Sequence, residues 1–307
     1  MFMHADYKED AAIDVWALGR DEKNLKDRFE PHIDSGHLRF IEQDIVKPLE
    51  SDICFDFVIH LAGDGYPGAF KEHPVETMTP AFIGTYNLLD YARKCMGCRF
   101  ILASSGEVYG TIQNKEAFVE EDCGYIDSMN SRSCYPIAKK AAETLCSSYV
   151  HEYGVSAIVA RLSHVYGPGS SPKDNRATVQ FMNKGIQGKD IVLFSDGKQM
   201  RSYTYVVDAV IGIMRILTSG VAGEAYNVAN ARSRLTIADF AHMVADECSV
   251  KCIFNIDKEY KEKTPISYAV LDTSKLEELG YEGIYTPTDG IKNSIQILRE
   301  CGNVRNN

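Results

Sequence analysis

The stretch Phe57-Val58-Ile59-His60-Leu61-Ala62 decides the fold of this chain, because it is an almost unbroken apolar run of strand length. Such a run is typical of a strand that is buried on both faces of a parallel sheet. Shorter β-rich runs recur before and after it. The other predicted strands are Ile13–Leu18, Leu38–Glu42, Phe100–Ala103, Ala157–Arg161 and Ala225–Val228.

Helical patterns separate these predicted strands. Strands that alternate with helices of this length predict an α/β fold with a doubly wound parallel sheet, helices on both faces and right-handed crossovers. Ligands bind beyond the carboxyl ends of such strands, so Ala62-Gly63, Ser104-Ser105 and Leu162-Ser163-His164 are expected to meet there. The predicted helices are Glu76–Lys94, Tyr135–Glu152, Thr178–Gln187, Val206–Thr218 and Ile237–Glu247.

The composition narrows the class of protein. With 307 residues, 45% of them hydrophobic, the chain can bury one or two cores. The net charge of −10 argues against nonspecific binding to nucleic acid or to an anionic membrane. No apolar run approaches the ~20 residues that span a bilayer, and the first residues lack the basic leader of a signal peptide. We therefore predict no nucleic-acid partner and no membrane partner.

Nine cysteines are scattered along the chain. An odd number of cysteines without a secretion signal is typical of reduced thiols, so we expect a cytoplasmic protein. Cys95-Met96-Gly97-Cys98 is a single Cys-x-x-Cys motif. A zinc site would need a second pair or nearby histidines, and neither is close in sequence. The sequence therefore predicts no metal site.

Two segments carry the predicted chemistry: Ala103–Gly110, which ends a buried strand, and Tyr135-Pro136-Ile137-Ala138-Lys139, which opens an amphipathic helix. Residues four apart share one helix face, so Lys139 is expected beside Tyr135. A neighbouring cation favours the phenolate and is predicted to lower the tyrosine pKa from its ordinary ~10. Ser105 could bind a substrate hydroxyl while Tyr135 takes its proton and a hydride passes to a nicotinamide. An ordinary surface tyrosine is the alternative.

The glycine-rich turn that normally opens a dinucleotide-binding fold does not occur at the start of this sequence. That turn lets the backbone approach a pyrophosphate at a helix N-terminus, yet the first 18 residues contain no glycine. Ile13–Leu18 is therefore interpreted as the second strand of such a fold, and Met1–Lys8 as the tail of its first helix. We expect a truncated fragment or a misassigned start codon. A protein that has lost its cofactor site is the alternative.

Four motifs carry a family resemblance: Asp56–Gly63, Ser104–Gly110, Arg161–Gly169 and Arg201–Asp208. They resemble the extended short-chain dehydrogenase/reductase family of nucleotide-sugar epimerases, dehydratases and decarboxylases, and the likeness runs over nearly the whole chain. The resemblance implies a Rossmann-type fold with its first strand and glycine loop truncated, NAD as cofactor and a nucleotide-diphosphate sugar as substrate. It implies a dinucleotide-binding domain at 1–168 and a smaller, interleaved substrate-binding region at 169–307, with a return segment at about 200–232.

The resemblance also implies roles for individual residues. Ser105, Glu107, Tyr135 and Lys139 would form the catalytic set. Arg20 stands where an acidic residue usually grips the adenosine ribose, and it could accommodate a 2′-phosphate, so NADP stays open beside NAD. The implied cofactor-binding residues are Arg20, Asp44, Ile45, Leu61, Ala62, Gly63, Tyr135 and Lys139, and the implied substrate-binding residues are Ser105, His164, Arg176 and Arg201.

The residues after Ser105 bear on the reaction. Gly106 stands where a sugar 4,6-dehydratase has an acidic aspartate, which argues against dehydration, whereas Glu107 keeps the carboxylate of dehydratases and UDP-glucuronate decarboxylases. The helix around Tyr135 also resembles the decarboxylase subgroup. Gly169 replaces that subgroup's arginine for the substrate carboxylate, so a nucleotide-sugar 4-epimerase is the alternative. A noncatalytic nucleotide-sugar-binding subunit is the alternative of another class.

The resemblance finally implies an assembly. Dimers of the family pair two helices from each subunit into a four-helix bundle, and these helices cover about Glu76–Lys94 and Tyr135–Glu152 here. A homodimer is therefore expected.

We predict that the 307-residue chain binds NAD weakly and unfolds more readily than a version extended upstream. The physical reason is that a central strand without a neighbour leaves the sheet incomplete, and that no glycine turn cradles the pyrophosphate. Calorimetric titration with NAD and thermal unfolding of both versions check this. Equal and tight binding by the two would contradict the expected truncation.

Overall fold

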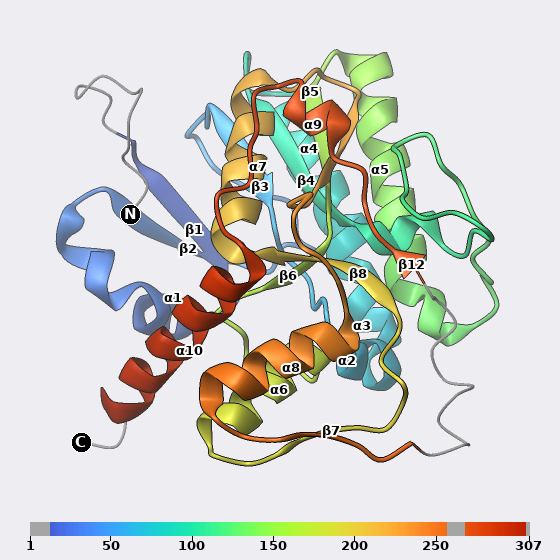
Figure 1. Ribbon diagram of the computed structural model, residues 1–307. Coiled ribbons are helices and arrows are strands. Elements are labelled where there is room, and N and C mark those ends of the chain that lie inside the picture. Colours follow the sequence, from blue (N-terminus) through green and yellow to red (C-terminus); the bar gives the residue numbers. More distant parts are fainter. Residues whose placement is uncertain (1–12, 257–267, 305–307) are drawn as a thin grey trace.

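The computed structural model describes residues 13–256 and 268–304 (Figure 1). Met1–Lys8, the predicted helix tail, lies outside these residues. The strands are β1 (Val15–Gly19), β2 (Leu38–Glu42), β3 (Phe57–His60), β4 (Arg99–Ser105), β5 (Ser156–Leu162), β6 (His164–Tyr166), β7 (Ile191–Leu193), β8 (Met200–Tyr205), β9 (Ala225–Val228), β10 (Arg234–Thr236), β11 (Cys252–Phe254) and β12 (Tyr268–Ala269). The helices are α1 (Glu22–Phe29), α2 (Pro67–Glu72), α3 (Pro74–Thr79), α4 (Thr85–Ala92), α5 (Cys134–Tyr153), α6 (Ala177–Ile186), α7 (Val206–Ser219), α8 (Ile237–Cys248), α9 (Ser274–Glu277) and α10 (Pro287–Val304).

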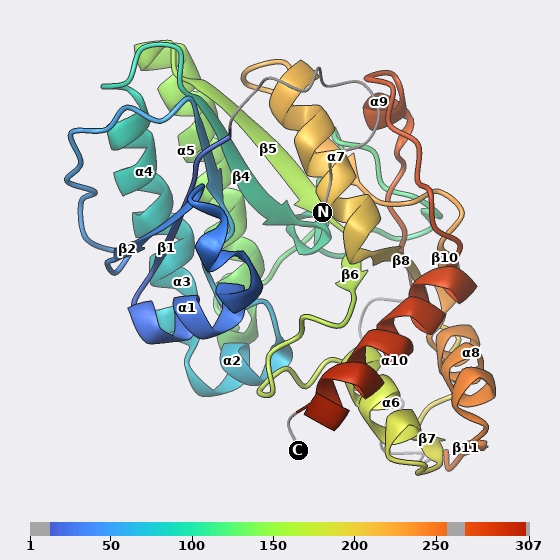
Figure 2. The ribbon, with the colours of Figure 1, turned by 90° about the vertical axis from the view of Figure 1, so that its left-hand side faces the viewer.

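Four parallel strands form the central sheet in the order β3-β4-β5-β9. Alternate residues of β4 point to opposite faces, so Phe100 and Leu102 are buried against α4 and α5, whereas Ile101 is buried on the α7 side. In β5, Val159 and Ile158 divide between the faces in the same way. Figure 2 shows α4 and α5 on one side of the sheet and α7 on the other. The predicted doubly wound α/β sheet is confirmed.

Strand β3 departs from its prediction of burial on both faces. Val58 packs on the α4 side and His60 is buried, but Phe57 is 51% exposed and Ile59 is exposed as well. The reason is that α7 packs against β4, β5 and β9 and does not cover this face of β3. Within residues 13–256 and 268–304, β3 pairs only with β4, and β1 and β2 form a separate parallel pair.

The segment Glu76–Lys94 is helical as its pattern predicts, but a π-helical turn lies within it. The chain forms α3, the π-helical turn η2 (Pro80–Gly84) and α4 without a break in the helical backbone. Pro74 and Pro80 each begin a new piece, because proline has no N–H to donate to the preceding turn. The turn places Gly84 against the β2–β3 connection, where a Cβ would lie 3.0 Å from the Ile45 side chain.

The C-terminal part of the chain has its own core. Phe240, Val244 and Ile295 are fully buried where α6, α8 and α10 meet β7 and β8. Strand β8 pairs with β6, β10 and β12, and β7 pairs with β11. The sequence patterns predicted α6, α7 and α8 to within two residues of their ends, but missed α1, α10 and these strands. Strands β6, β7, β10, β11 and β12 have two or three residues each, too few to show a clear alternation. Strand β8 has six residues, but its buried Arg201, Ser202 and Thr204 interrupt any apolar run.

Membrane insertion by a helix finds no support in the fold. Within the described part of the chain, no helix combines the length and the apolar character that crossing a bilayer requires.

Candidate active site

The carboxyl end of β4 docks onto α5 through polar contacts at consecutive residues. The Nζ atom of Lys139 donates a 2.7 Å hydrogen bond to the carbonyl oxygen of Ala103. The next residue, Ser104, donates from its Oγ atom to Oε1 of Glu143 at 2.5 Å. Lys139 and Glu143 are one helical turn apart, so successive strand residues are matched to successive turns of α5.

Ser105, the next strand residue, faces the first turn of α5, where Tyr135 lies. Its side chain lies close enough to the Tyr135 hydroxyl to lower the pKa of the phenol, and Nζ of Lys139 lies 6.0 Å from the centre of the Tyr135 ring. The structure therefore brings Ser105, Tyr135 and Lys139 together, as the sequence predicted. Lys139 is only 5% exposed, whereas Tyr135 keeps part of its surface accessible.

Local sequence positions this helix. A 3-10 turn, η4 (Ser131–Ser133), precedes α5, and the Asn130 side chain caps it by accepting a 3.0 Å hydrogen bond from the Arg132 N–H. Pro136 falls in the first turn of α5, where its missing N–H has no intrahelical partner to lose. Gly154 ends the helix in the left-handed region, with φ of +69°. These signals place Tyr135 in the first turn, beside the end of β4.

The predicted lowering of the Tyr135 pKa is wrong for this structure. Burial raises the pKa of Tyr135 to about 12, and the nearby Glu107 carboxylate adds to the rise. The nearby Ser105 side chain and the charges of Arg176 and Arg132 act in the opposite direction but do not outweigh burial. The phenol is therefore neutral at pH 7.

The pKa of Lys139 is lowered to about 8, because its ammonium is removed from water. The carboxylate of Glu143 opposes this effect. The site at neutral pH thus pairs a protonated phenol with an ammonium that is close to losing its proton.

A stack of side chains covers the Tyr135 ring, and sequence reasoning missed it. Phe70 of α2 stacks on Tyr135 with ring centres 4.6 Å apart and an interplanar angle of 19°. The guanidinium of Arg132 lies 4.6 Å from the centre of the Phe70 ring. Arg132 also forms a two-pronged ion pair with Glu107, at 3.1 and 3.2 Å. Arg132 lies only three residues before Tyr135, but its contact with the ring stack runs through Phe70, which is distant in sequence. Only the packing of α2 against the start of α5 could reveal this stack.

Arg176, an implied diphosphate ligand, is held by neighbouring protein groups. Its Nε and Nη2 atoms donate to the Asp174 carboxylate, with a shortest distance of 2.6 Å. Its Nη1 atom donates to the carbonyl oxygen of Val165 at 3.0 Å. The guanidinium is thereby fixed at the start of α6, while about a third of the side chain stays accessible.

His164 and Arg201 lie on the paired strands β6 and β8. His164 is opposite Tyr203, two residues after Arg201. Desolvation lowers the pKa of His164, and the charges of Arg201 and Arg176 lower it further. Burial also lowers the pKa of Arg201, and Glu107 is close enough to oppose that change. The structure therefore brings the three implied substrate residues to the same edge as Glu107.

The implied cofactor residues lie at the carboxyl ends of β1, β2 and β3. Arg20 is exposed directly after β1. Asp44 follows β2 and accepts a 3.1 Å hydrogen bond from the Val46 N–H. Beyond β3 come Leu61, Ala62 and Gly63, which are partly or largely exposed. Ile45 is the exception to this exposure, since it packs against the core under α4.

These residues fit the nicotinamide side of a dinucleotide. Gly63 adopts φ of +127°, and a Cβ built there would meet no atom within 4 Å, so the backbone is open to a ligand. A Cβ on Gly65 would lie 3.8 Å from the Tyr135 hydroxyl, which places this loop over the phenol. Lys139 places its Nζ atom 6.0 Å from the centre of the Tyr135 ring, beside the same loop.

His60 is a buried histidine beside this site. Its Nε2 atom lies 3.2 Å from the carbonyl oxygen of Pro80, and its Nδ1 atom is buried without a hydrogen-bond partner. Burial lowers the pKa of His60 to about 4, and the charge of Lys139 contributes. The ring is therefore neutral at pH 7.

Comparisons with known proteins agree with this geometry. A sequence profile described as "NAD dependent epimerase/dehydratase family" matches residues 4–229. UDP-glucuronic acid decarboxylase 1 of Xenopus tropicalis is 28% identical over 295 residues, which are 96% of this chain and 67% of that protein. UDP-glucuronic acid decarboxylase 6 of Arabidopsis thaliana is 32% identical over 272 residues, which are 86% of this chain and 75% of that protein.

A solved structure shows the same fold. The UDP-glucuronic acid 4-epimerase from Bacillus cereus, in complex with UDP-glucuronic acid and NAD, has a TM-score of 0.79 to this chain at 22% identity. The match covers 95% of this chain and 93% of that one. At this identity the likeness concerns the fold.

We predict that His60 makes the fold sensitive to acid. Its folded-state pKa of about 4 lies below the ordinary 6.5, so the unfolded chain binds the extra proton between these values. Stability is then full above pH 6.5 and falls by about 3 kcal/mol as the pH drops towards 4. Urea unfolding of the wild type and of His60→Leu at pH 7, 5 and 4 checks this. A loss of stability that is equally steep in the two proteins would contradict the role of His60.

Proposed function

The chain belongs to the NAD-dependent epimerase/dehydratase family, and from that premise we propose that it oxidises a nucleotide-diphosphate sugar transiently at C4, with decarboxylation of UDP-glucuronate as the net reaction. The observation that carries the proposal is the meeting of Ser105, Tyr135 and Lys139 at the end of β4. Relatives named UDP-glucuronic acid decarboxylases, which match 86% and 96% of the chain, favour this substrate.

The proton chemistry follows from the charges at the site. NAD, when bound, supplies the acceptor for the C4 hydride. The Tyr135 hydroxyl and the Ser105 hydroxyl would both reach the C4 oxygen, because the two side chains lie close together at the end of β4. Tyr135 would first lose its own proton to solvent, and the ammonium of Lys139 would stabilise the resulting phenolate. This phenolate would then take the hydroxyl proton as the alcohol becomes a ketone. The sugar carboxylate is then β to a ketone, so carbon dioxide can leave with its electrons delocalised into that ketone.

The opposite side of the site would hold the rest of the substrate. Arg201 and Arg176 would neutralise the diphosphate, which suits bidentate recognition by guanidinium groups. His164, between them, would bind as a neutral donor or acceptor, since its pKa is lowered. Glu107 is paired with Arg132, so its carboxylate would act near the sugar without leaving an uncompensated negative charge there.

Two alternatives remain beside decarboxylation. A 4-epimerase needs only room for the keto sugar to rotate, and Gly169 leaves the chain without the arginine expected for a substrate carboxylate. Gly106 cannot donate a proton, which disfavours a 4,6-dehydratase. A noncatalytic nucleotide-sugar-binding subunit is the alternative of another class.

We expect purified, upstream-extended protein to release carbon dioxide from UDP-glucuronate when NAD is supplied. Tyr135→Phe should reduce this release at least ~10²-fold, because it removes the group that transfers the proton, yet keep cofactor binding. The stacking on Phe70 does not need the hydroxyl, so this variant should fold. Carbon dioxide trapping and calorimetric titration with NAD measure the two properties.

Other outcomes of this assay identify the alternatives. Interconversion of sugars at C4 without loss of carbon dioxide would identify an epimerase. Neither cofactor binding nor turnover with any nucleotide sugar would identify the noncatalytic subunit. Unchanged turnover in Tyr135→Phe would remove Tyr135 from the mechanism.

We also propose that the chain forms a homodimer through α4 and α5 with their counterparts, as a four-helix bundle. Helices α3, α4 and α5 pack together as one layer on the sheet. Their outer surface exposes large apolar side chains, which water disfavours and a partner would cover. These side chains are Val75, Met78, Phe82, Ile83, Tyr86 and Tyr153.

Light scattering coupled to size-exclusion chromatography tests the dimer. We expect the wild type to elute as a dimer and Tyr86→Glu, which places a charge in the apolar surface, to elute as a monomer. Met96→Glu is the matched control, because Met96 is fully exposed in the turn after α4. A monomeric wild type, or dissociation by both variants alike, would refute this interface.

Two coarser assignments complete the proposal. We divide the chain into a dinucleotide-binding part at 1–168 and a substrate-binding part at 169–307, supported by the separate buried core around α6 and α8. We place the protein in the cytoplasm, which the nine free cysteine thiols support.

A further inference from the structure

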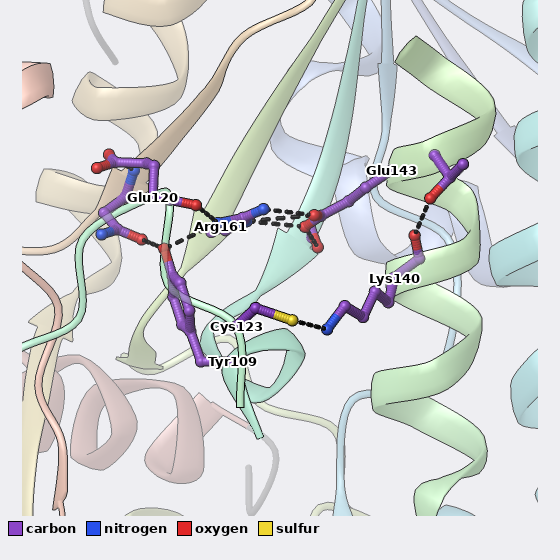
Figure 3. A network of polar contacts seen from close by, with 9 residues as sticks. Tyr109, Glu120, Cys123, Lys140, Glu143 and Arg161 are labelled. Carbon is purple, nitrogen blue, oxygen red and sulfur yellow. Dashed lines mark hydrogen bonds and ion pairs between the residues drawn. The ribbon is translucent and has the colours of Figure 1, made fainter. Parts of the chain in front are cut away.

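The carboxylate of Glu143 is held from two strands at once (Figure 3). Ser104 of β4 donates to Oε1 at 2.5 Å. Arg161 of β5 donates from Nε to both carboxylate oxygens, at 3.1 and 3.2 Å, and from Nη2 to Oε2 at 2.8 Å. Only 11% of the Glu143 side chain is exposed. These donors fix the position of the carboxylate next to the guanidinium of Arg161.

Arg161 is itself fixed on its other side. Figure 3 shows its guanidinium between Glu143 and the hydroxyl of Tyr109. Its Nη1 atom donates to the Tyr109 hydroxyl at 3.1 Å and to the carbonyl oxygen of Glu120 at 2.6 Å. Tyr109 in turn donates to Asn227 of β9 at 2.6 Å. The arginine therefore cannot swing away from Glu143 without breaking its hydrogen bonds to Tyr109 and to Glu120.

Glu143 and Lys139 are locked in register with the sheet. Lys139 binds the carbonyl oxygen of Ala103, Glu143 binds the hydroxyl of Ser104, and Ser104 pairs with Arg161 across β4 and β5. The two charged side chains thus sit one helical turn apart on the same face of α5, both shielded from water.

The titratable groups that face Lys139 come from α5 and β3. They are Tyr135, Glu143 and Cys146 on α5, and His60 on β3. Burial raises the pKa of the Cys146 thiol and of the Tyr135 phenol, and lowers that of the His60 imidazole, so these three are uncharged at neutral pH. Among these described groups, Glu143 is the one that carries a negative charge.

We propose that Glu143 is a positioning residue that keeps the buried Lys139 ammonium protonated at neutral pH, and that Arg161 limits this effect by neutralising part of the carboxylate charge. The inference deepens the proposed function, because that chemistry needs a charged Lys139. The inference concerns only whether the Lys139 amine is protonated in the protein without substrate. It can therefore hold or fail independently of which reaction the enzyme catalyses.

Removing the charge of Glu143 and removing the charge of Arg161 should shift the pKa of Lys139 in opposite directions. Glu143→Gln removes the negative charge and leaves desolvation unopposed, so the pKa of Lys139 should fall. Arg161→Gln removes the neutralising guanidinium, so the same pKa should rise. A merely structural loosening would instead let water reach Lys139 in both variants and raise its pKa in both towards the ordinary value.

Competitive labelling measures this amine directly. Trace acetic anhydride is added between pH 6 and pH 11, and mass spectrometry quantifies acetylation of the peptide that contains Lys139. We expect the midpoint for Lys139 to fall by ~1 pH unit or more in Glu143→Gln, to rise in Arg161→Gln, and to be restored towards the wild-type value in Glu143→Asp. Glu152→Gln, an exposed position on the same helix, is the matched control and should leave the midpoint unchanged.

The double variant Glu143→Gln with Arg161→Met tests the same effect on Lys139 in a protein that is less prone to misfold. It removes both charges together, so neither is left buried and unpaired, and the Lys139 midpoint should still fall. Circular dichroism confirms the fold of each variant before labelling. An unchanged or higher midpoint in the folded Glu143→Gln or double variant would overturn the proposal.

Discussion

The docking of α5 along the end of β4 is the constraint on which the rest of this site depends. Ala103 and Ser105 of β4 lie against Lys139 and Tyr135, which are one helical turn apart. A strand rises about 3.3 Å per residue and a helix about 5.4 Å per turn, so this match of two strand residues to one helical turn holds over only a short stretch. It is placed where the strand ends, and there it delivers a phenol, an ammonium and a hydroxyl to one point.

The burial of Tyr135 and Lys139 is the second physical constraint on this site. The same packing that fixes Tyr135 and Lys139 also strips water from them, which raises the pKa of the phenol and lowers that of the ammonium. Both pKa shifts favour the uncharged forms of these side chains. The proposed proton transfer instead needs Lys139 in its charged ammonium form. The network around Glu143 and Arg161 offers a counterweight built from groups outside the reacting centre. Desolvation gives such charges more influence than they would have at the surface.

The two sides of the site are built differently. On the α5 side, regular elements hold the groups in a rigid register. On the substrate side, His164 and Arg201 come from the short strands β6 and β8, and Arg176 comes from the loop before α6. Short connections tolerate sequence change better than packed helices and strands. This is consistent with departures from the family pattern, such as His164 and Gly169, that fall on the substrate side.

The amino-acid sequence by itself determined the order of the main strands and helices and the pairing of Tyr135 with Lys139. These features depend on local periodicity, which a single segment carries. Only the tertiary structure decided that the Tyr135 pKa rises, that Phe70 covers its ring and that Glu143 meets Arg161. Desolvation and ion pairing between separate elements depend on which surfaces come together, and no local spacing records that. The exposed face of β3 is a further example, since its burial depended on the reach of α7 rather than on its own apolar residues.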